Sequence, residues 1–195
     1  MRLCDDQLAI NNSRMQFENF QLFARNGNAL TLYGYFDFAD FDRMQTYLRM
    51  RADNYLLIDS KENARSEAYG KAYVNFLGLV DGPLDALRMR GKLDVLGSSN
   101  VTYILRDSPL STESQLDGLV KFVNFRKPET ATVAKPPING LNMDLTVNVD
   151  DGAHVLCALN PDKSNYVDLI GGGNLRMLYT AIDGLSLYGR YTIAE

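Results

Sequence analysis

Apolar and polar residues alternate with a period of two over long stretches of this chain. The clearest case is "GLNMDLTVNVDDG", residues 140–152, where every second side chain from Leu141 to Val149 is apolar and those between are polar. Successive side chains of a strand point to opposite faces, so the pattern predicts a β-strand with one apolar and one polar face. That apolar face can contact another sheet, the interior of a barrel, or a molecule that is not protein.

The same alternation recurs along most of the chain and predicts further strands. For 43–60 we favour a strand, with a short helix over 40–50 as the alternative; Asn26-Gly27 predicts a hairpin turn. Residues 87–97 and 99–107 follow one another across Gly97 and are expected to pair as a meander. The other expected strands are 29–38, 67–80, 118–125, 153–159, 165–180 and 184–195.

Few segments depart from this strand pattern. Residues 107–117 are expected to be a loop, and 126–137, with three of the six prolines, a mobile surface connection within a single β-domain over 1–195. Without a crossover helix a parallel α/β sheet is excluded, which leaves a meander, a sandwich or a barrel. The final "YGRYTIAE" ends in mid-strand, so we expect a longer parent protein.

Composition excludes several classes of function. The net charge is −4 and no Lys/Arg cluster is present, which argues against nucleic acid as a partner. Cys4 and Cys157 have no partner spacing and are expected to be unpaired thiols. The N-terminus lacks a signal-peptide core, and no apolar run reaches the roughly 18 residues of a membrane helix.

Catalytic chemistry is not expected either. His154 is the only histidine, and at a strand start it is expected to be hydrogen-bonded or exposed. Gly171-Gly172-Gly173 lacks the Lys-Ser/Thr of a phosphate loop and is interpreted as a bend or close-approach site. The Asp residues of "YFDFADFD" and "NVDDG" fit turns rather than a calcium loop. We therefore predict no enzyme, no cofactor and no metal.

Several motifs nevertheless carry a family likeness. "GPLDAL.MRG", "VTY.L.DSPL" and "NY..L.GGGNL" lie within a stretch, from about residue 30 to 193, that resembles the C-terminal domain of the TamB translocation and assembly module in its Bacteroides-type form. Against the family pattern, 126–137 is short, and the N-terminal anchor and a C-terminal continuation are absent, so the chain resembles a fragment or truncated form.

The resemblance implies an all-β fold, in which an extended, curled antiparallel sheet forms an open U-shaped apolar groove. It implies an envelope scaffold, facing the periplasm, whose full-length members are anchored in the inner membrane. Such proteins are implicated in phospholipid transport between the membranes and in outer-membrane protein assembly. The implied partners are lipid acyl chains and a BamA-type barrel protein such as TamA.

On this hypothesis the apolar rows line the groove. A closed β-sandwich or barrel, acting as a protein-binding or adhesin-like module, is the alternative, in which the same rows are ordinary core. The expected lining residues are Leu141, Met143, Leu145, Val147, Val149, Leu175, Met177, Tyr179, Leu185 and Leu187, together with Leu93, Val95, Val74 and Phe76.

Overall fold

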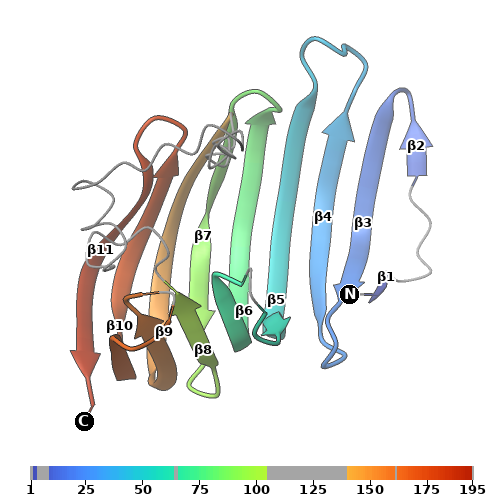
Figure 1. The fold of residues 1–195 in the computed structure, drawn as a ribbon. Coiled ribbons are helices and arrows are strands. Elements are labelled where there is room, and N and C mark those ends of the chain that lie inside the picture. Colours follow the sequence, from blue (N-terminus) through green and yellow to red (C-terminus); the bar gives the residue numbers. More distant parts are fainter. Residues whose placement is uncertain (1, 4–8, 64–65, 105–139, 161, 195) are drawn as a thin grey trace, which may run out of the picture.

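The chain folds as one curved β-sheet, and no helix occurs among the residues that the structure describes. The computed structural model describes residues 2–3, 9–63, 66–104, 140–160 and 162–194. Figure 1 shows the strands side by side in a single layer. Their bounds are β1 Arg2–Leu3, β2 Ala9–Asn11, β3 Arg14–Phe23, β4 Ala29–Asp37, β5 Gln45–Ser60, β6 Ala68–Pro83, β7 Leu87–Val95, β8 Asn100–Ile104, β9 Leu141–Ala158, β10 Tyr166–Thr180 and β11 Gly184–Ile193.

Among the described strands, the sheet follows chain order almost throughout, with β1 at one end and β11 at the other. Its strands run β1-β3-β4-β5-β6-β7-β9-β10-β11, with β2 beside β3. Neighbouring strands pair antiparallel, with two exceptions: β9 lies parallel to β7 and to β8. With its other neighbour, β10, β9 pairs antiparallel. The predicted extended, curled, mostly antiparallel sheet is confirmed, and the described strands form one sheet rather than the two packed sheets of a sandwich.

Most predicted strands are confirmed, and the one predicted over 43–60 forms β5 over 45–60 in place of the alternative helix. The Asn26-Gly27 hairpin joins β3 to β4, where Gly27 has a positive φ of 85°. The segments 140–152 and 153–159 merge into the single strand β9. The loop, strand and connection expected at 107–117, 118–125 and 126–137 lie outside the described residues.

The predicted meander of 87–97 with 99–107 is wrong, because β7 and β8 do not pair with each other. β7 pairs with β6 over 74–81, and β8 pairs with β6 over 68–71. Both strands also pair with β9, β7 at 141–149 and β8 at 154–158. The two are therefore successive parts of one interrupted strand between β6 and β9.

A transverse line of irregular pairing crosses the sheet at the level of this interruption. β5 shifts register between Ala52 and Tyr55, and β10 shifts against β9 between Gly171 and Gly173. Between β7 and β8, the amide N–H of Leu96 donates to the Tyr73 carbonyl at 2.9 Å, so the turn still bonds to β6. Bulges bend strands and increase their twist, so we expect the sheet to bend along this line, which is here called the crease.

Candidate functional site: an apolar face across the sheet

One face of the sheet carries apolar side chains in register from β3 to β11. Paired residues of neighbouring strands point to the same side, so each row of partners shares a face. One row runs Phe20, Leu32, Met50, Gly78, Gly91, Leu145, Met177 and Leu187, and the next runs Leu22, Leu30, Ala52, Phe76, Leu93, Val147 and Leu175.

Two more rows flank these and complete what we call the apolar face. Toward the crease lie Tyr55, Val74, Val95, Val149 and Gly173. On the other side lie Leu48, Val80, Met89, Met143, Tyr179 and Leu185, followed by the pair of Leu87 with Leu141.

The pairing register brings all of the predicted lining residues onto this one face. The rows above contain every predicted residue of β9, β10 and β11 and also those of β6 and β7. On β9 these are the apolar residues from Leu141 to Val149, on β10 those from Leu175 to Tyr179, and on β11 Leu185 and Leu187. Their role as a lipid lining stays a prediction. The structure adds further residues, chiefly in the N-terminal half of the face, that the sequence pattern did not identify: Phe20, Leu22, Leu30, Leu32, Leu48, Met50, Ala52, Val80 and Met89.

Burial varies along the rows of the apolar face. Leu145 and Val147 on β9 are only 3% and 7% exposed, and Ala52, Tyr55 and Val74 form a buried cluster on β5 and β6. At the outer strand the face is open, because Leu187 on β11 is 57% exposed. The face thus offers a protected centre and an exposed margin.

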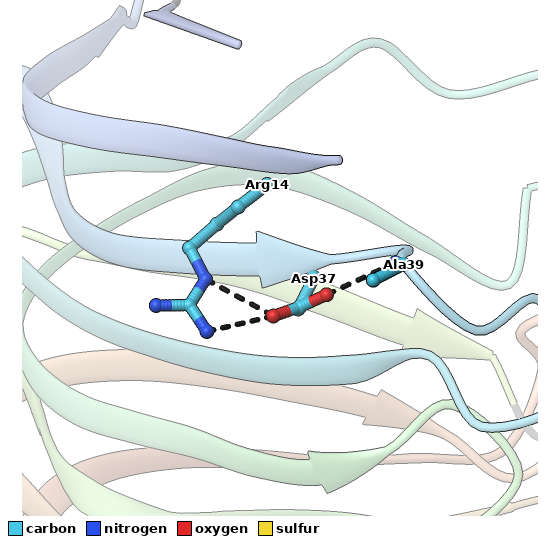
Figure 2. Close-up of polar contacts among 3 residues, drawn as sticks. All are labelled: Arg14, Asp37 and Ala39. Atoms are coloured by element: carbon cyan, nitrogen blue, oxygen red, sulfur yellow. Dashed lines mark hydrogen bonds and ion pairs between the residues drawn. The ribbon is translucent and has the colours of Figure 1, made fainter. Parts of the chain in front are cut away.

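The opposite face, here called the polar face, is covered by ion pairs. Figure 2 shows one at its N-terminal side, where Arg14 on β3 donates to Asp37 on β4 through Nε and Nη2. The amide N–H of Ala39 donates to the other carboxylate oxygen at 3.0 Å. This amide, and then the guanidinium, hold the pKa of Asp37 below its ordinary value.

Further pairs follow along the polar face toward β10. Lys92 donates to Asp94 at 3.0 Å, and Asn148 donates to the same carboxylate at 2.6 Å. Partial burial raises the pKa of Asp94, but these hydrogen bonds together outweigh it, and the pKa lies below its ordinary value. Since these ion pairs all lie on one side and the rows of paired apolar residues lie on the other, the two faces of the sheet differ in polarity.

The other residues considered for chemistry have structural partners. Asp37 and Asp40 accept amide hydrogens from Ala39 and Asp42 two residues on, as expected of turn-forming residues, whereas the turn expected at "NVDDG" is wrong because Asp150 and Asp151 lie within β9. His154 is hydrogen-bonded to Asp168, as expected of a histidine outside a catalytic cluster, although it lies within β9 and not at a strand start.

The glycine run is confirmed as a site of close approach. A Cβ on Gly171 would lie 2.1 Å from the Thr192 carbonyl oxygen, and one on Gly172 would lie 2.6 Å from that of Val149. Backbone therefore packs on backbone here, at the crease.

No metal centre or membrane-spanning helix emerges from the described part of the chain. Cys157 has a free thiol, whereas Cys4 lies outside the described residues. Within the described ranges, His, Cys, Asp and Glu do not gather in groups of three or more that could hold a metal ion. The same ranges contain no helix that is long and apolar enough to cross a bilayer.

Comparison with known proteins agrees with this architecture. The family model described as the TamB C-terminal domain matches residues 18–195, which is most of the chain. The chain belongs to the TamB family. Neither the curated proteins nor the solved structures contain a match to it. TamB membership associates the chain with the bacterial cell envelope and with translocation and assembly, a type of module that is not enzymatic.

Proposed function

We propose that the apolar face lines an open groove that solvates lipid acyl chains. The observation that carries this proposal is the continuity of the face, which runs in register from Phe20 on β3 to Leu187 on β11. Each buried CH2 of a lipid tail contributes about 0.8 kcal/mol, so such a face can hold a chain without specific polar contacts. Met50, Met89, Met143 and Met177 add flexible side chains that adapt to a mobile ligand.

In this proposal the protein is an envelope scaffold for phospholipid transport between the inner and outer membranes and for outer-membrane protein assembly. It faces the periplasm, and its partner is a BamA-type barrel protein such as TamA. Family membership supports both roles, and the apolar face supports the first more directly.

Two neighbouring residues on β11 allow a matched test in cells. Leu187 belongs to the apolar face and is 57% exposed, whereas Tyr188 pairs with Arg176 on the polar face and is 60% exposed. A photo-crosslinking residue, p-benzoyl-phenylalanine, is placed at either position. Because accessibility is nearly equal, the proposal predicts lipid adducts predominantly at Leu187. Equal adducts from the two positions would contradict it.

A transfer assay tests the same proposal in the purified protein. Met177→Glu places a charge on the apolar face, while Thr146→Glu places the same charge on the exposed polar face of the neighbouring strand. Transfer of a fluorescent phospholipid between donor and acceptor vesicles should fall with Met177→Glu and stay near the wild-type rate with Thr146→Glu. Equal rates in the two variants would argue against an acyl-chain groove.

A further inference from the structure

A second surface lies on the polar face, over β5, β6 and β7. It is a depression of about 620 Å³, within the usual range of ligand sites. Its lining combines apolar and cationic groups and contains no carboxylate: Tyr47, Arg49, Leu77, Gly78, Leu79, Arg90, Gly91 and Lys92.

The pairing register explains how these groups come together. Arg49 on β5 and Arg90 on β7 are both partners of Leu79, which lies between them on β6. One row further, Arg51 and Lys92 are both partners of Leu77. A leucine stripe on β6 is therefore flanked on each side by cations, and Leu77 is 63% exposed.

Of the cations around this stripe, Arg51 and Lys92 are paired with Asp53 and Asp94, whereas the two arginines beside Leu79 are only partly neutralised. Arg49 has no carboxylate partner among the described residues: its Nε donates to the Tyr47 hydroxyl at 3.2 Å, and its guanidinium lies 5.7 Å from that ring. Nη2 of Arg90 lies 3.6 Å from Oδ2 of Asp81. The same carboxylate oxygen binds Nη2 of Arg88 more closely, at 3.0 Å. Two guanidiniums beside Leu79 thus retain positive charge for an anion, and guanidinium matches phosphate oxygens in geometry.

The position of β6 within the sheet favours a lipid surface over an acidic peptide. β6 is hydrogen-bonded to β5 on one side and to β7 on the other, so its main chain cannot pair with an extended peptide. Cations around an exposed leucine suit headgroup phosphates at the margin of an apolar layer. We propose that this part of the polar face docks on an anionic phospholipid surface, with phosphates at Arg49 and Arg90 and Leu77 against the lipid.

The proposal is tested by sedimentation of the full chain with vesicles. Vesicles of phosphatidylglycerol and phosphatidylcholine are compared with phosphatidylcholine alone, using wild type and Arg49→Gln/Arg90→Gln. Losing two membrane-proximal cations should weaken binding to the anionic vesicles roughly 30-fold at low salt. The matched control, Arg176→Gln/Arg190→Gln, removes two cations from the same face on β10 and β11 and should bind nearly as wild type.

A site-specific probe separates this docking from acyl-chain uptake by the apolar face. Leu77→Cys, in a chain with Cys4→Ser and Cys157→Ser, is labelled with an environment-sensitive dye whose emission should shift to the blue on anionic vesicles. The same dye at Tyr188→Cys should not respond. Adducts at Leu187 should persist in Arg49→Gln/Arg90→Gln, so failure of either proposal leaves the other standing.

Three results would overturn the docking proposal. The first is equal weakening by the two arginine pairs, which would mean that overall charge alone governs binding. The second is an unchanged dye spectrum at Leu77. The third is unaltered vesicle binding by Arg49→Gln/Arg90→Gln together with loss of binding to a Glu-rich peptide, which would assign the surface to an acidic protein partner.

Discussion

The guanidinium of Arg176 on β10 binds both carboxylate oxygens of Asp144 on β9, at 2.9 Å through Nε and 2.7 Å through Nη2. The two residues are diagonal neighbours on the polar face, while Met177 and Leu145, the next residue of each strand, are partners on the apolar face. The same two strands therefore carry an ion pair on one side and a lipid-compatible surface on the other. This pairing helps to fix the register, because a slip by one residue would exchange the two faces.

The Arg176–Asp144 pair predicts a measurable shift in titration. The hydrogen bonds from Arg176 hold the pKa of Asp144 below its ordinary value, so Arg176→Gln should raise that pKa toward the usual carboxyl range. Because the folded-state pKa is lowered, the pair contributes stability above the unfolded pKa and loses it as pH falls through the folded pKa. Side-chain carboxyl NMR of both proteins measures the shift; an unchanged Asp144 titration would contradict the assignment.

Two substitutions of Asn54, which lies at the crease, are expected to differ in their effect on the free energy of unfolding. Its φ is 47°, in the left-handed region, and its main-chain carbonyl accepts hydrogen bonds from the side-chain Nδ2 groups of Asn26 and Asn28, each at 2.7 Å. Asn54→Gly keeps this backbone accessible, whereas Asn54→Ala should lower the free energy of unfolding by about 1 kcal/mol more than glycine does. Urea unfolding curves of the two variants provide the measurement. Equal losses would show that the side chain, and not the backbone conformation, is what matters.

The faces of individual strands could be predicted from the sequence, because burial follows the period of two. Leu145 and Val147 stand out among Asp144, Thr146 and Asn148, and the register places them together on the buried side. The N-terminal half of the face was harder to identify. β3 shifts register between Phe17 and Phe20, and Asn19 has a positive φ of 64°, so simple alternation fails there.

Features that depend on pairing between distant segments could not be predicted from local patterns. Gly97-Ser98-Ser99 has the composition of a hairpin turn, yet the chain continues in line into β8 because Ser99 bonds to β6. The parallel contact of β7 with β9 joins segments more than forty residues apart in the chain, which no periodicity encodes. Likewise, Arg49 and Arg90 flank Leu79 only once the register of three strands is known.

Removal of the Ser99 hydroxyl is expected to lower the free energy of unfolding. It is 3% exposed, and its hydroxyl accepts from the Tyr73 amide at 2.9 Å and donates to the Tyr73 carbonyl at 3.1 Å. Ser99→Ala would leave the main-chain amide of Tyr73 without this partner, while the Tyr73 carbonyl keeps its bond from the Leu96 amide, and the loss should cost about 1–3 kcal/mol. The exposed neighbour provides the control, since Ser98→Ala should stay within about 0.5 kcal/mol of wild type. Indistinguishable urea midpoints for the two variants would refute the role assigned to Ser99.

Gly172 predicts that the crease between β9 and β10 tolerates no side chain. A Cβ there would lie 2.6 Å from the Val149 carbonyl oxygen and 2.8 Å from the Asp151 amide nitrogen, so backbone has to move. We expect Gly172→Ala to destabilise the fold by about 1–3 kcal/mol, as overpacking does. Gly97→Ala is the graded control, because its Cβ would meet nothing nearer than 3.3 Å, at Gly152 Cα, and its loss should be smaller.

Amide hydrogen exchange of the Gly172→Ala variant should show where the strain at this position is relieved. If β9 and β10 separate locally, protection should fall first at Val149 and Leu175, the residues of the apolar face nearest the crease on these strands. The yield of lipid adducts at position 187 should then differ from wild type in the Gly172→Ala variant. In the Gly97→Ala variant this yield should stay near that of wild type. A Gly172→Ala variant as stable as Gly97→Ala, with unchanged exchange at Val149, would mean that the bulge accommodates a methyl group and that close packing at the crease is not required.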